Sequence, residues 1–194
     1  MSEQFTLNKD RSALLIMDYQ NDILGNVLGK YPGLLDRATR TLDAARQASL
    51  PVIYVVSSFR PGYPEVGPDN RAVQRIRAAG ILREGTPGVE INSRVAPQEG
   101  EVVVVKRRAG AFSTTDLATI LRAGNITSLI LMGVLTSGVV LSTVRWGADT
   151  DYDLTVIEDC CADGDEEVHR VLTQKVLPMQ ARVVKSDDLI AALV

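Results

Sequence analysis

Six short runs of apolar residues set the strongest limit on the fold of this chain. They are rich in valine and isoleucine and lie at 12–17, 51–56, 102–105, 128–132, 154–157 and 181–184. Runs without polar alternation are typical of strands buried on both faces of a parallel sheet. Helical patterns of apolar residues, spaced three to four apart, separate them. The alternation predicts a three-layer α/β fold with a mostly parallel sheet and helices on both faces.

The segments between the runs predict helices and one unusual connection. Helices are expected from residue 34 onward and over 70–79, 114–123, 137–148, 165–177 and 187–193. The connection at 59–100 is long and rich in proline and glycine, so it either shapes a binding site or an oligomer contact, or is a surface excursion without a role. At 194 residues and 21.0 kDa, the chain is expected to form one domain over 1–194.

Charge and residue inventory exclude several classes of function. The formal charge is -3, which gives no sign of binding to nucleic acid or an anionic membrane, and no apolar stretch is long enough to cross a bilayer. The single histidine, His169, and two cysteines argue against a His/Cys metal site, so neither metal nor cofactor is expected. The adjacent Cys160 and Cys161 are interpreted as reduced thiols. With no signal-peptide pattern at residues 1–6, they predict a cytoplasmic protein.

Polar residues that end the apolar runs are the candidates for chemistry, because ligands of parallel sheets bind beyond the carboxyl ends of the strands. Ser57 and Ser58 follow the second run. Asp18 follows the first run and is either a general acid or base, or a cap of the next turn. Lys106 follows the third run and either pairs with Asp18 or extends to solvent in a basic rim with the arginines at 107 and 108.

The turn at 133–139 is the third candidate. A glycine turn followed by a helix presents unpaired backbone amides, which stabilise negative charge and lower the pKa of a thiol placed there. This chain has Val139, and no thiol, at the start of that helix. The spacing of Gly133 and Gly138 does not make a phosphate loop, because the Lys-Ser/Thr pair that should follow is absent.

The order Asp18, Lys106 and the turn Gly133-Val134-Leu135-Thr136 resembles the isochorismatase-like hydrolases, also called the cysteine hydrolase superfamily. The similarity covers nearly the whole chain and includes residues 15–22, 105–106, 111–113, 133–143 and 158–163. It implies a Rossmann-like sheet of six parallel strands in the order 3-2-1-4-5-6. It also implies a homo-oligomer, either a dimer or a tetramer.

The resemblance further implies a triad of Asp, Lys and Cys in amide-cleaving members. Asp18 matches the acid–base residue, Lys106 matches its electrostatic partner, and Val139 stands where the nucleophilic cysteine is expected. The oxyanion hole would come from the backbone amides of Leu135 and Val139. The peptide bond between the residues that match Val134 and Leu135 is commonly cis.

Valine has no nucleophilic atom, so the thioester route is closed to this chain. Cys160 and Cys161 follow the fifth run and are expected to be packing residues. Three interpretations stay open. Val139 is an introduced change in a binding-competent amidase site, or the chain is a vinyl-ether hydrolase with Asp18 as general acid, or it is a natural pseudoenzyme or binding protein.

The expected ligand is a small molecule, since aromatic residues are few. Nicotinamidase-type members carry a histidine-containing metal site after the second strand, and residues 57–63 contain no histidine, which disfavours that activity and its metal. Arg60 either binds a carboxylate or forms a surface salt bridge. The expected substrate contacts are Gln20, Phe59, Arg60, Phe112 and Trp146.

Overall fold

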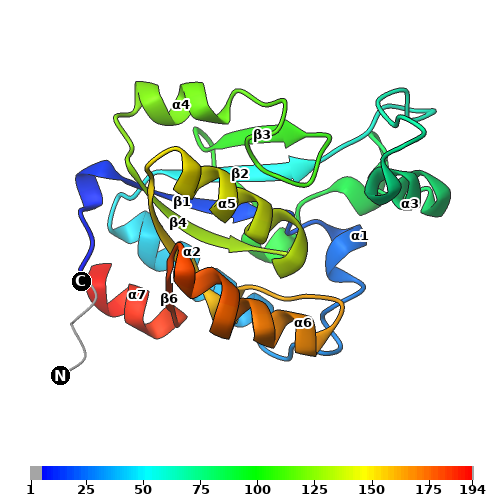
Figure 1. Ribbon diagram of the computed structural model, residues 1–194. Coiled ribbons are helices and arrows are strands. Elements are labelled where there is room, and N and C mark those ends of the chain that lie inside the picture. Colours follow the sequence, from blue (N-terminus) through cyan, green and yellow to red (C-terminus); the bar gives the residue numbers. More distant parts are fainter. Residues whose placement is uncertain (1–5, 194) are drawn as a thin grey trace.

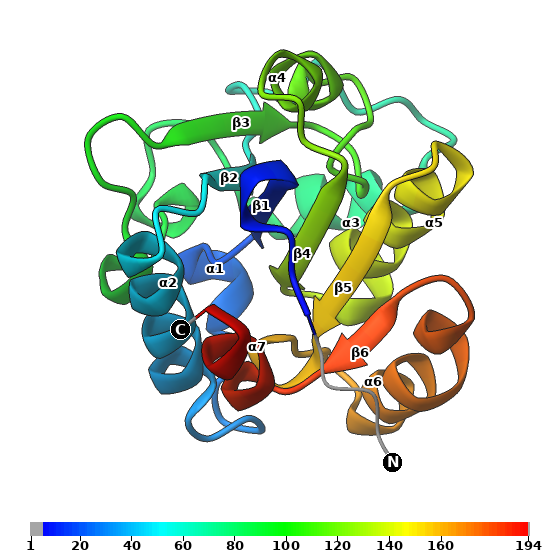
Figure 2. The ribbon, with the colours of Figure 1, turned by 90° about the vertical axis from the view of Figure 1, so that its left-hand side faces the viewer.

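A parallel sheet of six strands runs through the centre of the protein (Figures 1 and 2). The computed structural model describes residues 6–193. Residues 1–5, on which most of the expectation of no signal peptide depends, lie outside the described residues. The strand order is β3-β2-β1-β4-β5-β6, which confirms the predicted topology. The strands are β1 (Ser12–Met17), β2 (Val52–Ser57), β3 (Val102–Lys106), β4 (Ser128–Gly133), β5 (Asp153–Ile157) and β6 (Arg182–Val184).

Helices cover both faces of the sheet (Figure 2). α2 and α7 contribute to the core on one face, and α4 and α5 contribute to the core on the other. The helices are α1 (Asn21–Leu24), α2 (Leu34–Gln47), α3 (Arg71–Ala79), α4 (Leu117–Ala123), α5 (Leu141–Asp149), α6 (Glu166–Val171) and α7 (Ser186–Leu193). Within the described residues, none of these helices is long and apolar enough to cross a membrane.

The burial of the strands explains their continuous apolar runs. In β1, Leu14 and Ile16 face the α2–α7 core, whereas Leu15 and Met17 face the α4–α5 core. Successive side chains of a strand point to opposite faces, so a central strand needs apolar residues at every position. The expectation of two buried faces is wrong for the two edge strands. In β3, Val103 is 43% exposed, and in β6, Arg182 is exposed and the two valines are half-buried.

Two predicted helices are interrupted by wider turns. The helix expected over 137–148 begins with a π-helical turn, Thr136–Val140, before α5. The helix expected over 165–177 becomes α6, a second π-helical turn and a short 3-10 turn, Leu177–Met179. Regular α-helix ends at Val171, and Pro178, which has no N–H to donate, lies in the final 3-10 turn. Apolar spacing alone does not distinguish these turns from regular helix.

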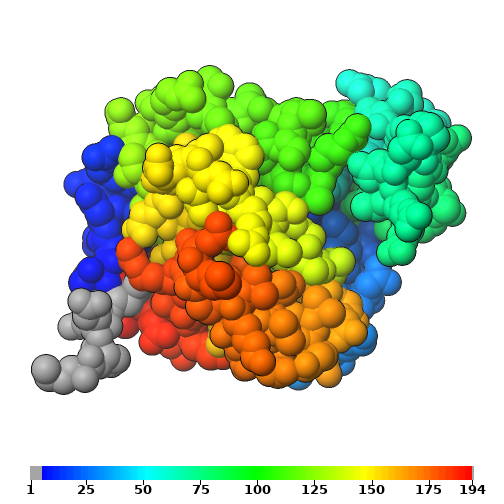
Figure 3. Space-filling view, in the orientation of Figure 1, coloured from blue at the N-terminus to red at the C-terminus, as the bar shows by residue number. Residues whose placement is uncertain are grey.

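The first part of the connection at 59–100 forms a lobe at the end toward which the strands point (Figures 1 and 3), and its last part packs against α2 on the way to the amino end of β3. The lobe contains α3, close to the predicted bounds of 70–79. Asn70 caps α3 by accepting the amide of Val73, and Gly80 ends it with a φ of +66°. A small apolar cluster that includes Phe59, Val73 and Leu82 holds the lobe together. The lobe therefore stands as a wall beyond the carboxyl ends of β1, β2 and β3.

Candidate active site

Asp18, Ser57 and Lys106 form a buried hydrogen-bond network at the carboxyl ends of three neighbouring strands. Lys106 Nζ donates to Asp18 Oδ2 and to Ser57 Oγ, both at 2.7 Å, and Ser57 Oγ donates to Asp18 Oδ1 at 3.1 Å. A third bond runs from Lys106 Nζ to the carbonyl oxygen of Arg108 at 3.1 Å. An ammonium group has three protons to donate, and all three have an acceptor. The cost of burying this lysine is thereby offset within the site.

The local backbone brings the three side chains together. Lys106 ends β3 opposite Ser57 in the parallel register of β2 and β3. Asp18 follows β1, its amide donates to the carbonyl of Val55 at 2.8 Å, and its φ is +58°. Aspartate is one of the few residues that tolerates this left-handed conformation. The turn directs its carboxylate across β2 toward the lysine.

Burial controls the proton affinity of Asp18. Loss of hydration raises the pKa of this carboxyl above its ordinary value, and the charge and hydrogen bond of Lys106 oppose the rise only in part. The hydrogen bonds from Ser57 lower the pKa further, without reversing the direction. A carboxyl with a raised pKa can hold and return a proton closer to neutral pH, which suits acid–base chemistry.

The turn after β4 lies beside this network. The peptide bond between Val134 and Leu135 is cis, as the family resemblance implies. The Thr136 amide donates to the carbonyl of Ala162 at 2.8 Å, and the Ser137 amide donates to Asp163 Oδ2 at 2.7 Å. These bonds tie the turn to the segment after β5.

A cavity of about 470 Å³ joins the network and the turn. Asp18, Ser57 and Lys106 line it together with Leu135 and Val139. Its wall toward the lobe is apolar and consists of Phe59, Val73, Ile76, Ile81 and Leu82. A size in this range and a few convergent polar groups are typical of small-molecule sites. The 59–100 connection thus shapes this cavity, one of the two roles that its length predicts.

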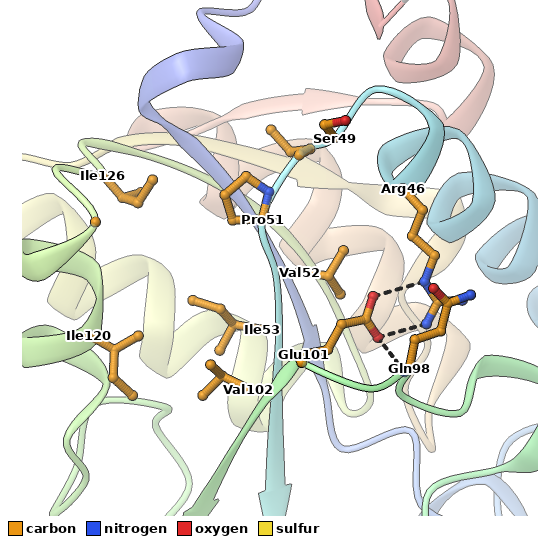
Figure 4. A pocket seen from close by; sticks show the side chains of 13 residues that line it. Arg46, Ser49, Pro51, Val52, Ile53, Gln98, Glu101, Val102, Ile120 and Ile126 are labelled. Atoms are coloured by element: carbon orange, nitrogen blue, oxygen red, sulfur yellow. Dashed lines mark hydrogen bonds and ion pairs between the residues drawn. The ribbon is translucent and has the colours of Figure 1, made fainter.

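A second cavity, of about 440 Å³, lies at the opposite, amino ends of β2 and β3 (Figure 4). Its polar side contains the ion pair between Arg46 and Glu101, with Nη2 and Oε2 2.7 Å apart. The two charges pair with each other, and the apolar side of the cavity includes Pro51, Val52 and Ile53. Because ligands of parallel sheets bind at the carboxyl ends of the strands, we assign the candidate site to the first cavity.

The cavity brings together part of the predicted site. Asp18, Lys106, Leu135, Val139 and Phe59 all line it. Among the residues described, no three His, Cys, Asp or Glu side chains cluster as metal ligands do.

Gln20, predicted to contact substrate, does not line the cavity. Its side chain accepts from the amide of Ser57 and donates to the carbonyl of the same residue, both at 2.8 Å, and also donates to the carbonyl of Val89. Gln20 therefore fastens the end of β2, and with it the Ser57 hydroxyl. The position of Gln20, two residues after Asp18, does not indicate that its side chain points toward the backbone of β2.

Arg60, Phe112 and Trp146 also lie away from the cavity. The Arg60 side chain is 58% exposed and pairs with Glu65 at 2.6 Å, which corresponds to the surface salt bridge of the two alternatives. The rings of Phe112 and Trp146 stack on each other at 3.7 Å between centroids. Trp146 lies two helical turns after Val139, which carries its ring away from the turn.

Arg75 and Arg108 line the cavity and are not among the predicted substrate contacts, whereas Ser57 lines it and is one of the strand-end candidates. Ser57 was visible as the residue that ends the second run, yet its contact with two charged groups depends on strand pairing. Arg108 lies beyond the end of β3 at Lys106, so strand alternation does not place its side chain. The sequence therefore carries no signal that separates it from Arg107.

The fold and the cavity define a class: a Rossmann-like α/β protein with a candidate site at the carboxyl edge of a parallel sheet. The chain belongs to the isochorismatase family, because the model of the isochorismatase domain matches residues 12–188.

Two relatives and one solved structure show the range of similar proteins. The ureidoacrylate amidohydrolase RutB of Agrobacterium fabrum is 29% identical over 178 residues, which cover 81% of this chain and 78% of that protein. A probable inactive nicotinamidase of Arabidopsis thaliana is 30% identical over 184 residues, or 92% of each chain. The crystal structure of a cysteine hydrolase from Pseudomonas syringae pv. phaseolicola superposes with a TM-score of 0.89. It covers 100% of this chain and 98% of that one at 24% identity, a likeness of fold.

Proposed function

We propose that this chain carries the site of a small-molecule amide hydrolase of the Asp–Lys–Cys type, with Val139 in the position of the nucleophile. In this proposal the site binds its ligand and does not cleave it by the thioester route. The observation that carries the proposal is the complete Asp18–Ser57–Lys106 network, which lines the same cavity as Val139. The similarity to an amidohydrolase supports a C–N amide as the bond that the site recognises.

Each residue has a defined task if a thiol stands at position 139. Asp18 takes the thiol proton, the sulfur attacks the amide carbon, and Asp18 returns the proton to the departing nitrogen. Lys106 holds the carboxylate of Asp18 in place and balances its charge. The backbone amides of Leu135 and Val139 would stabilise the oxyanion. Water then hydrolyses the thioester, so the isopropyl group of Val139 removes the first covalent step and leaves the remaining groups in place.

Restoring the thiol tests the proposal. We expect Val139→Cys to release ammonia from at least one member of a panel of primary and N-carbamoyl amides, while the parent chain releases none. Val140→Cys is the matched control, because Val140 is the next residue, is fully buried and is absent from the cavity lining. If folded Val139→Cys stays inactive on every amide, the amidase interpretation is wrong.

A vinyl-ether hydrolase is a second candidate, favoured by one observation. Burial raises the pKa of Asp18, which favours the proton-bearing form that a general acid requires, and general-acid catalysis needs no nucleophilic cysteine. This candidate requires turnover of a vinyl ether with Val139 in place and loss of turnover in Asp18→Ala. A non-catalytic binding protein instead requires ligand binding that is unchanged in Asp18→Asn, and no turnover by either 139 variant.

We also propose a cytoplasmic homo-oligomer, either a dimer or a tetramer. The exposed valines at 102, 103 and 105 of edge strand β3 offer an apolar contact surface, which supports self-association. Light scattering tests this, since a mass near 21.0 kDa would describe a monomer. Two free buried cysteines are compatible with a reducing compartment.

A further inference from the structure

The cavity beside Val139 carries an excess of positive charge. Among the described residues that line it, Asp18 carries a carboxylate, and Lys106, Arg75 and Arg108 are cationic. Lys106 forms its ion pair with Asp18, so two guanidinium groups remain. This excess occurs in a chain with a formal charge of -3, and it is therefore a property of the cavity and not of the whole surface.

Arg108 is the more informative of the two guanidinium groups because it is half-buried. Its Nη1 donates to the carbonyl of Arg107 at 2.6 Å, and its Nη2 donates to the carbonyl of Glu65 at 3.3 Å. Both acceptors are neutral. Within residues 6–193, no carboxylate forms an ion pair with this side chain.

Neighbouring arginines are neutralised, which sets Arg108 apart. Arg107 pairs with Glu65 and Glu84, both at 2.9 Å, and Arg60 pairs with Glu65. A partly buried cation whose partners are all neutral gains strongly from an anion, because charge-assisted hydrogen bonds are about twice as strong as neutral ones. The planar guanidinium fits a carboxylate through two parallel bonds.

The opposite side of the cavity specifies the rest of the ligand. Phe59, Ile76 and Leu82 form an apolar wall, and Val139 adds a methyl-bearing surface where a thiol is expected in the family. These side chains favour an aliphatic or aromatic group, not a sugar or a polyol. A ligand that fills the cavity therefore has an apolar body and one anionic end.

We infer that the cavity binds a small monocarboxylate with an apolar body, and that Arg108 holds the carboxylate. Arg75, which is exposed on α3, adds a second positive charge at the rim. This inference rests on the proposed function and deepens it, because the apolar body and the carboxylate are the part of the ligand other than the amide placed at Val139. The sequence offers Arg60 as a residue that could bind a carboxylate, and this inference assigns that role to Arg108 instead.

Calorimetric titration of the full chain tests the inference without any need for turnover. The probes are hexanoate, phenylacetate and cyclohexanecarboxylate, each beside its uncharged primary amide. We expect at least one acid to bind at least tenfold more tightly than its amide. Arg108→Gln should remove this preference, Arg108→Lys should keep part of it, and Arg75→Gln should reduce it by a smaller factor.

Two controls separate a local contact from general charge. Arg77→Gln removes a charge from an exposed position of α3 that does not line the cavity, and it should leave the preference unchanged. Arg60→Gln should also have no effect, and loss of the preference in that variant would return the role to Arg60. The thermal unfolding temperature of each ligand-free variant shows whether weaker binding results from loss of the folded state. Partial binding by Arg108→Lys would show the same for position 108.

Several results would overturn the inference. These are the absence of binding by all three acids at millimolar concentration, equal binding of acid and amide, or an unchanged preference in Arg108→Gln. If benzylphosphonate binds tenfold more tightly than phenylacetate, the anionic group that the cavity recognises is a phosphonate or phosphate and not a carboxylate. An inactive Val139→Cys variant would refute the proposed amidase site and leave these binding results standing, so the two failures are distinguishable.

Discussion

Replacing Lys106 with methionine should destabilise the protein by about 3–5 kcal/mol, because it leaves one half of a buried ion pair alone. The side chains of Lys106 and Asp18 are 2% and 6% exposed, and their charged atoms are 2.7 Å apart. Methionine keeps most of the volume of the stem and removes the ammonium group. Asp18 would keep only the Ser57 hydroxyl as a side-chain donor.

The loss should depend on pH with a defined sign. Burial raises the pKa of Asp18 above 3.8, so the folded chain holds this proton more tightly than the unfolded chain. The stability from that proton is complete below the unfolded pKa and is lost as the pH rises through the folded pKa. Without Lys106, the main influence that lowers the pKa is gone and the pKa rises further. The deficit of the variant relative to the parent should therefore be largest near pH 8 and shrink toward pH 5.

Urea unfolding, followed by far-ultraviolet circular dichroism and by the single tryptophan, measures this deficit. The double variant Asp18→Asn/Lys106→Met should recover much of the stability, because it leaves no unpaired charge. Arg40→Met is the control. Its pair with Asp187 has the same 2.7 Å separation, but the two side chains are 59% and 76% exposed, so almost no change is expected. A loss below about 1 kcal/mol at pH 8, or a deficit that grows as the pH falls, would refute the reasoning.

Two further predictions concern the core around the site. Burial raises the pKa of Cys160 to about 12 and also raises the pKa of Cys161, so iodoacetamide at pH 8 should leave both thiols unmodified in the folded chain and alkylate both in urea, as measured by mass spectrometry. Gly133→Ala should cost about 1–3 kcal/mol in urea unfolding, because its Cβ would lie 3.1 Å from Met17 Cβ, the Met17 carbonyl oxygen and Val140 Cγ2. Gly29→Ala has nothing within 4 Å of the added Cβ and should be neutral by the same measurement, so equal losses in the two variants would contradict the packing argument.

Much of the architecture could be predicted because each strand carries its own signal. Continuous apolar runs identified the six strands, and the family resemblance implied their order. The runs did not reveal that β3 is exposed at the edge, since its valines match those of a central strand. The π-helical turn at Thr136–Val140 was also beyond reach, because a three-to-four spacing is compatible with regular helix and with one wider turn.

The site was only partly predictable, because its members meet across strands. Asp18 and Lys106 could be proposed from their places at strand ends, and they do form an ion pair. Gln20 also follows a strand end, but its side chain forms hydrogen bonds with the backbone of Ser57 in β2 and does not line the cavity. Trp146 was proposed for its aromatic character, and its position two turns along the helix removes it from the cavity.

The sequence by itself determined which chemistry is available: an acid, a lysine and an amide-bearing turn, with valine where the family resemblance places a thiol. Only the tertiary structure decided which charges neutralise each other. Arg60, Arg107 and Arg108 are the same residue type, yet the first two pair with carboxylates, while Arg108 lines the cavity and donates to the neutral carbonyls of Arg107 and Glu65. The reason is physical: ion pairs depend on distances of a few ångströms between segments far apart in the chain, and those distances exist only after the strands and the lobe have packed.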